Sequence, residues 1–195
     1  ENCSLCVAGN HDLYAVKKTP NNNAGFEYGP DWYALPYETR EKRARNKIWL
    51  YEDNELRCRL NTESFEYLAD LPEVLSVPYD DGGIQCSHFC YPDYTGSTIF
   101  FPAEPFHLRN HFEQMKTANC TLGVSGHGHP AGILIAGPET LKVHKAGRHI
   151  LDDQLNWIVV PCVARTTRPN GVAIYDTGLR ELRAVPLSRN SMKKE

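Results

Sequence analysis

Short segments rich in β-branched and apolar residues follow one another beyond residue 120, and Gly, Pro or Asp separates each from the next. This pattern predicts strands, because such runs fit a pleated, half-buried surface and their separators fit turns. The predicted strands cover residues 121–125, 131–136, 140–145, 157–163, 172–175 and 182–185. A chain of this kind must bury its C-terminal part in one or more packed sheets.

Most of the predicted helices lie before residue 120. The residue pattern predicts them over 37–47, 61–69 and 105–116. Asn61 can cap the second of these helices, and Pro72 ends it. The third carries its apolar face on Leu108, His111, Phe112 and Met115. Strands over 74–77 and 84–88, joined by a turn at 81–83, complete an α/β (α+β) pattern.

The length and the lack of internal repeats, low-complexity tracts or linkers predict a single domain over residues 1–195. Lys and Arg number 21 against 24 Asp and Glu, a net charge of −3, which does not favour a binder of nucleic-acid polymers. No apolar run approaches the ~18 residues of a membrane span. The seven cysteines are an odd number, which favours reduced thiols and a cytoplasmic protein. Cys3-x-x-Cys6 has no second half-motif, so we interpret both residues as core cysteines.

Side chains that can bind metals come directly after three predicted strands, the first of which is the apolar run 4–9. The three groups are Asn10-His11-Asp12, His88 and Gly126-His127-Gly128-His129. On an extended backbone, residues i and i+2 share a face, so His127 and His129 can converge on one ion. Each group also has a simpler interpretation when it is considered alone. A lone histidine such as His88 is more often structural than a ligand, and Asn10-His11-Asp12 could form a turn. Together they favour a site, because the strand ends of α/β sheets are where sites are built.

Gly-Asn-His-Asp at 9–12, the lone His88 and Gly-His-Gly-His at 126–129 resemble, in this order, the last three motif blocks of calcineurin-like metallophosphoesterases. Residues 66–72, 156–164 and 171–176 resemble further segments of the small bacterial-type branch of that family. The earlier blocks, Asp-x-His and Gly-Asp-x-x-Asp, are absent, so the chain resembles the C-terminal two-thirds of the domain. The resemblance implies a four-layer αββα sandwich of two mixed β-sheets, here without its N-terminal strand and helix.

The resemblance also implies an activity: hydrolysis of phosphate esters by a hydroxide that bridges two divalent metal ions. Manganese is favoured, and iron or zinc also suits such ligands. The implied metal ligands are Asn10, His88 and His127 for the second metal and His129 for the first. His11 would protonate the leaving oxygen, and Asp12 would orient the His11 ring. Arg165 and Arg168 are expected to contact the substrate, which would be a phosphodiester, a nucleotide or a phosphoprotein.

Two other interpretations stay open. The missing carboxylate motifs favour a non-catalytic, truncated phosphoesterase fold that serves as a binding or scaffold subunit. A His/Cys metal-binding module unrelated to this family is the third. Segment 17–60 is expected to form a cap or rim over the active site. Its aromatic and arginine residues could stack on a base or grip a phosphate, although a solvated helix with an aromatic core face explains them better; they are Trp32, Tyr33, Tyr37, Arg40, Arg43 and Arg45. An oligomer or a separately supplied N-terminal segment would complete the site.

Overall fold

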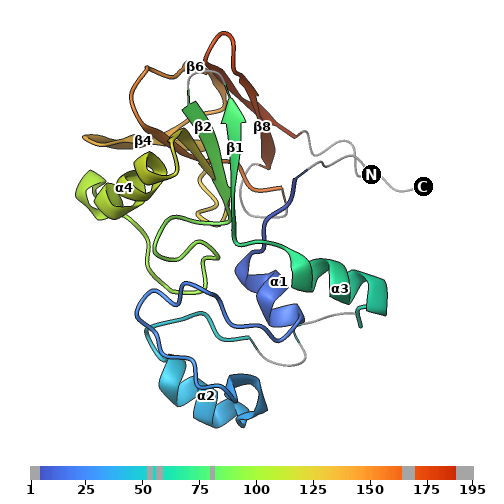
Figure 1. Cartoon of the computed structure of the whole chain (residues 1–195). Helices are drawn as coiled ribbons and strands as arrows, with labels where there is room; N and C mark the ends of the chain where they lie inside the picture. The colour runs from blue at the N-terminus through green and yellow to red at the C-terminus, as the bar shows by residue number, and fades with distance from the viewer. Residues whose placement is uncertain (1–4, 52–54, 56–58, 80–81, 164–169, 188–195) are drawn as a thin grey trace. The chain divides into compact units, whose positions relative to one another are not determined.

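The computed structural model describes residues 5–51, 55, 59–79, 82–163 and 170–187. The chain divides into two compact units: unit 1 comprises Glu1–Leu75 and Cys86–Phe101, and unit 2 comprises Ser76–Gln85 and Pro102–Glu195. Unit 2 holds the greater part of the β-structure, and unit 1 is mainly helix and loop (Figure 1). The prediction of one domain over residues 1–195 stays a prediction.

Two sheets account for the β-structure. The larger has the strand order β1-β2-β3-β7-β4-β5, in which β3 and β7 are parallel and β4 is antiparallel to both β5 and β7. The smaller has the order β6-β9-β8, and both of its pairings are antiparallel. The strands are β1 Val74–Tyr79, β2 Gly82–Ser87, β3 Cys120–Ser125, β4 Ile133–Gly137, β5 Thr140–His144, β6 Gly147–Ile150, β7 Asn156–Val159, β8 Gly171–Asp176 and β9 Glu181–Pro186. The smaller sheet is therefore antiparallel, not mixed as expected.

The apolar core of unit 2 lies between these sheets. It is formed by Leu122, Ile133, Leu151, Ile158, Leu182 and Ala184, all buried. Because the alternating side chains of a strand point to opposite faces, Leu182 and Ala184 of β9 meet the larger sheet while Arg183 between them is exposed. The α+β class predicted from the element pattern and the sandwich implied by the resemblance are thus confirmed.

A helical layer covers the other face of the larger sheet. It consists of a 3-10 turn, Pro105–Leu108, followed by α4, Arg109–Thr117 (Figure 1). The predicted apolar face is buried at all four positions. Gly123 of β3 allows the close approach, since a Cβ there would lie 3.0 Å from both Met115 Sδ and Trp157 Cδ1. The predicted apolar face of this helix is therefore confirmed.

Unit 1 contains α1 Asn10–Ala15, the 3-10 turn Trp32–Ala34, α2 Tyr37–Ala44 and α3 Thr62–Asp70, and α1 packs beside α3 (Figure 1). Asn61 caps α3 as predicted, because its Oδ1 accepts a hydrogen bond of 2.8 Å from Ser64 N. A second apolar cluster joins α2 to its neighbours through edge-to-face rings. Its buried members are Phe26, Trp32, Ala44 and Ile48.

Several expectations were wrong in detail. Residues 5–9 do not form a strand of either described sheet: Ala8 N donates a 2.8 Å hydrogen bond to Pro72 O, just before β1, and Leu5 is 51% exposed. Helix α1 begins directly after them, at Asn10. The strand predicted over 157–163 is β7, which ends at Val159, and β6 was not predicted. Within the described residues, no helix is both long enough and apolar enough to cross a membrane.

Candidate functional site

The Gly-Asn-His-Asp segment forms the first turn of α1 in unit 1. Gly9 precedes the helix with extended backbone, and its N–H donates a 2.9 Å hydrogen bond to Asp12 Oδ2. The carboxylate thus satisfies an amide that the helix itself leaves without a partner. Asp12 fixes the start of α1 and hence the direction of the side chains on that turn. Its predicted role as the group that orients His11 stays a prediction.

Tyr51 joins the two neighbouring candidates, Asn10 and His11. The Asn10 side chain is buried, and its Nδ2 donates a 2.5 Å hydrogen bond to Tyr51 Oη. The exposed His11 ring lies against the same phenol, with ring centroids 4.4 Å apart. Because the amide nitrogen is held by Tyr51, Oδ1 is the Asn10 atom that can bind a cation. Nothing in the local sequence pattern pointed to Tyr51, which reaches α1 through tertiary structure.

His88 lies directly against Gly9. It follows β2, is half-buried, and belongs to unit 1. A Cβ placed on Gly9 would lie 2.9 Å from His88 Cγ and 3.0 Å from both Cδ2 and Nδ1. Only glycine leaves room for the ring there. The fold thus brings an imidazole beside the residue that precedes Asn10, as a shared site for a borderline metal ion requires.

The Gly-His-Gly-His segment follows β3 in unit 2. His127 and His129 are half-buried and have φ values of 51° and 44°, so the extended backbone predicted for them is wrong. A left-handed conformation at a non-glycine residue costs of order 1–3 kcal/mol and is typical of functional segments. The end of β3 is held firmly, since Ser125 Oγ accepts a 2.9 Å hydrogen bond from Trp157 Nε1. The same left-handed conformation occurs at Lys17, Ala24, Asn46, Asn119 and Arg180, so it does not by itself mark a site.

Two of the predicted site residues cannot be located in the structure. Arg165 and Arg168 lie outside the described residues. Among the residues that the structure describes, no group of three or more His, Cys, Asp and Glu side chains is arranged to hold a metal ion. The candidate ligands of unit 1 are Asn10 and His88, and those of unit 2 are His127 and His129. The donor set fits a divalent transition metal chemically, because amide oxygen and imidazole nitrogen both bind such ions.

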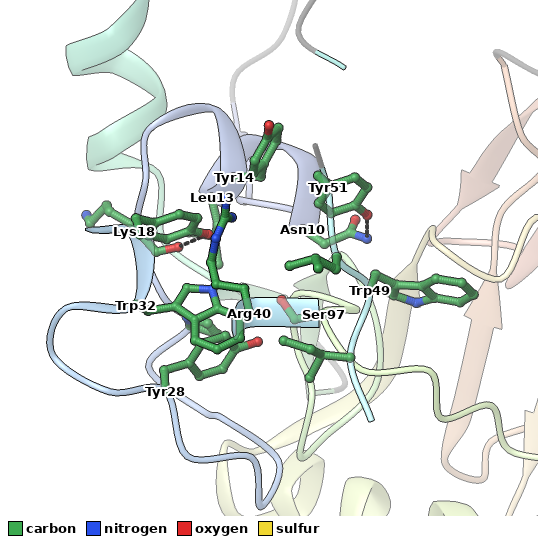
Figure 2. Close-up of a pocket in the computed structure, with 14 residues that line it drawn as sticks. Asn10, Leu13, Tyr14, Lys18, Tyr28, Trp32, Arg40, Trp49, Tyr51 and Ser97 are labelled. Atoms are coloured by element: carbon green, nitrogen blue, oxygen red, sulfur yellow. Dashed lines mark hydrogen bonds between the residues drawn. The ribbon is translucent and has the colours of Figure 1, made fainter. Parts of the chain in front are cut away.

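A narrow pocket in unit 1 adjoins Asn10. Figure 2 shows Arg40 running through the middle of the residues that line it, with the hydrogen bond from Asn10 to Tyr51 on one side. The cavity volume is about 20 Å³, which is space for about one water molecule. The wall consists of Asn10, Leu13, Tyr14, Lys18, Pro20, Tyr28, Trp32, Tyr33, Arg40, Ile48, Trp49, Leu50, Tyr51 and Ser97. Burial raises the pKa of Tyr33 to about 12 and also raises the pKa values of Tyr28 and Tyr51.

Solved structures of other proteins have folds similar to that of this chain. A metallophosphoesterase from Sphaerobacter thermophilus superposes with a TM-score of 0.57 at 15% identity, over 93% of this chain and 65% of that one. A hypothetical protein from Pyrococcus horikoshii OT3 gives a TM-score of 0.54 at 10% identity, and the superposition covers 96% of this chain and 64% of that one. An archaeal phosphodiesterase aligns with 93% of this chain and 97% of its own at 18% identity, but the TM-score is only 0.36.

The present chain spans about two thirds of the length of the first two structures. No protein-family model and no curated protein matches its sequence. The identities are too low to carry residue roles or substrates from one protein to the other. What the superpositions establish is the architecture. The fold of this chain is similar to that of a metallophosphoesterase.

Proposed function

We propose that this chain belongs to an enzyme that hydrolyses phosphate esters with the help of divalent metal ions. The observation that carries the proposal is the His88 ring lying against Gly9, directly before Asn10. These residues are far apart in the sequence, and the motif order alone led us to expect them at one site. The likeness of the fold to that of a metallophosphoesterase supports the same conclusion.

The proposed metal ligands are Asn10 and His88 of unit 1 and His127 and His129 of unit 2. When bound, two divalent cations would neutralise the phosphate oxygens and make a water molecule acidic enough to attack phosphorus at neutral pH. Tyr51 would hold the Asn10 amide with Oδ1 directed to the cation, because it binds Nδ2. Such outer partners commonly change metal affinity by about 10–100-fold. We favour manganese, with iron or zinc as the alternatives.

His11 is the proposed proton donor to the leaving oxygen. Its ring is exposed, so a substrate can reach it, and the Tyr51 ring limits its rotation from one side. Imidazole is the side chain most often used as a general acid or base in catalysis. Asp12, one residue further along α1, is proposed to orient the His11 ring. Removing His11 should therefore slow turnover without removing the metal.

The substrate is proposed to be a phosphodiester, a nucleotide or a phosphoprotein, with Arg165 and Arg168 contacting its phosphate. Segment 17–60 would form the rim of the site, and an oligomer or a further segment of polypeptide would supply the remaining ligands. We propose a cytoplasmic location because the cysteines suit a reducing compartment. Cys90 and Cys120, for example, are buried thiols, and burial raises the pKa of Cys90.

The test is hydrolysis of bis(p-nitrophenyl) phosphate after reconstitution with Mn²⁺. We expect turnover that EDTA abolishes and that His11→Ala reduces by about 10²-fold or more, while the manganese content of that variant stays near that of the wild type. His149→Ala is the matched control, because this histidine lies on β6 and belongs to none of the three motifs. Manganese bound without any turnover would refute the proposal and favour the scaffold interpretation.

A further inference from the structure

Unit 1 carries an exposed apolar surface outside the metal-binding motifs. Ile99, Phe100 and Phe101 are three consecutive apolar residues that are all exposed, and Trp49 is 43% exposed. An exposed run of three or more apolar residues is unfavourable in water and is typical of a surface that binds another group. We call these four residues the apolar platform.

Backbone hydrogen bonds fix Ile99 beside the segment that carries Trp49. Trp49 N donates a 2.8 Å hydrogen bond to Ser97 O, and Ile99 N donates a 3.1 Å hydrogen bond to Lys47 O. The residues between these pairs form an antiparallel bridge, so the two segments make a short two-stranded ribbon. The backbone therefore determines where these two side chains of the platform lie.

Trp49 points away from the buried cluster of unit 1. Ile48 is a member of that cluster, and Leu50 packs against it. Because successive side chains of an extended segment alternate in direction, Trp49 between them faces the opposite side. Figure 2 shows the indole directed away from Trp32 and Arg40. The indole is therefore available to a ligand at the surface.

Tyr51 connects the platform to the proposed proton donor. Residues i and i+2 of an extended segment share a face and lie about 7 Å apart, so Trp49 and Tyr51 lie on the same side. The Tyr51 ring lies against the ring of His11, with ring centroids 4.4 Å apart. The separation along the segment matches the size of one aromatic ring system. A ring bonded to the oxygen that His11 protonates can therefore reach the Trp49 indole.

Phe101, at the end of the platform, leads to a proposed metal ligand. The Phe101 ring lies 5.3 Å from the Phe89 ring, and Phe89 directly follows His88 in the chain. The platform is therefore linked both to His88 and, through Tyr51, to His11. An apolar group of a phosphate ester bound at these two histidines would gain by leaving water for this surface.

We propose that the apolar platform binds a planar aromatic ring on the leaving alcohol of the substrate, with the ring stacked on the Trp49 indole. The substrate class is then phosphate esters of aryl or nucleoside alcohols, not of short alkyl alcohols. The P–O bond to this alcohol breaks as the water oxygen bonds to phosphorus; His11 gives its proton to the alcohol oxygen, and the proton of the water passes to solvent. This inference rests on the proposed function for the reaction, whereas the ring site lies within unit 1 and can be tested without turnover.

The test uses the tryptophans as reporters, because Trp49 is exposed whereas Trp32 and Trp157 are buried and serve as internal references. The ¹⁵N-labelled chain, kept in EDTA, is titrated with phenyl phosphate and, separately, with ethyl phosphate at constant ionic strength. We expect the indole N–H signal of Trp49 to shift and saturate with phenyl phosphate and to stay in place with ethyl phosphate. An unmoved Trp49 signal up to about 50 mM phenyl phosphate, or equal shifts with both esters, would overturn the proposal.

A third titration separates two sources of such a ring. Adenosine 5′-monophosphate that binds more tightly than phenyl phosphate would identify the ring as a nucleobase. Tighter binding of phenyl phosphate would identify an aryl alcohol. Both results support the platform, whereas binding of either ligand without a shift of the Trp49 signal would contradict it.

Variants identify the stacking partner. Trp49→Ala should weaken phenyl phosphate binding about tenfold, because the stacking surface is lost, and Trp49→Phe, which keeps a ring, should weaken it about threefold or less. Phe106→Ala removes an exposed aromatic ring of unit 2 and should leave binding unchanged. If Trp49→Ala does not fold, as an altered Trp157 signal would show, Ile99→Ser is the second variant and should weaken binding about threefold. Wild-type affinity in the folded Trp49→Ala variant, or otherwise in Ile99→Ser, would refute the assignment.

A kinetic comparison then tests whether the ring belongs to the leaving group. Ethyl p-nitrophenyl phosphate carries a ring only on its leaving alcohol, whereas bis(p-nitrophenyl) phosphate carries one on each ester group. In Trp49→Ala, kcat/KM should fall about tenfold for both substrates. A fall for the bis ester alone would assign the platform to the group that stays on phosphorus and would contradict the proposal. The outcomes separate the two proposals: ring binding without hydrolysis refutes the proposed function alone, and hydrolysis without a ring-dependent shift of the Trp49 signal refutes this inference alone.

Discussion

Substitution of Gly9 by alanine should be costly for one reason only. The backbone at Gly9 has φ −106° and ψ 176°, an extended conformation that alanine adopts without strain. The added Cβ would lie 2.9 Å from His88 Cγ, whereas ordinary contacts begin near 3.4 Å. The His88 ring must therefore move by about half an ångström. Overpacking of this kind costs about 1–3 kcal/mol of unfolding free energy.

A double-mutant cycle isolates this contact. Gly9→Ala, His88→Ala and the double variant are compared by urea unfolding followed by circular dichroism. We expect Gly9→Ala to cost about 1–3 kcal/mol alone and close to zero once His88 is alanine, a coupling of about 1 kcal/mol or more. Gly178→Ala is the control, since a Cβ there would meet Asp176 Oδ1 at an ordinary 3.5 Å. Equal costs of Gly9→Ala in both backgrounds would refute the placement of His88.

Three further predictions concern stability and metal affinity. Burial lowers the pKa of His111 to about 4. Because the imidazole binds a proton more readily in the unfolded chain, the free energy of unfolding should fall by about 3 kcal/mol between pH 6.5 and pH 4. Urea unfolding of the wild type and of His111→Gln at both pH values measures this fall. Tyr51→Phe should weaken Mn²⁺ binding about tenfold with little change in stability, since it releases the Asn10 amide, and calorimetry measures both effects. Asn61→Ala should cost about 1 kcal/mol in urea unfolding, because Ser64 N loses its capping acceptor.

The sequence predicted the elements whose pattern is local. The strands beyond residue 120 were recognisable because turn residues separate them, and α4 because its apolar positions recur at helical spacing. Strand β6 was missed, since Gly147–Ile150 has neither alternation nor β-branched residues before its last position. Residues 5–9 have the composition of a buried strand, yet they join neither of the described sheets, and Ala8 N donates its hydrogen bond to Pro72 O, just before β1. Composition alone therefore gave a wrong prediction here.

The site was predictable only as a set of residues. Motif order pointed to Asn10 and His88, but the contact of the His88 ring with Gly9 depends on tertiary packing. The left-handed backbone at His127 could not be foreseen, because strain of this kind is imposed by surrounding structure and not by propensity. Arg40 lies in a charged run that is typical of a solvated helix, and nothing local shows that it is buried. The pocket beside Asn10 therefore emerged only from the fold.

The most direct test of these assignments is the manganese content of the chain after reconstitution with Mn²⁺ and desalting. Mass spectrometry would measure it for the wild type, His88→Ala, His127→Ala and the control His149→Ala. We expect the wild type and the His149 variant to retain manganese in stoichiometric amounts and the other two variants to lose most of it. Equal manganese retention in all four proteins, or none in the wild type, would contradict the assignment of His88 and His127 as metal ligands.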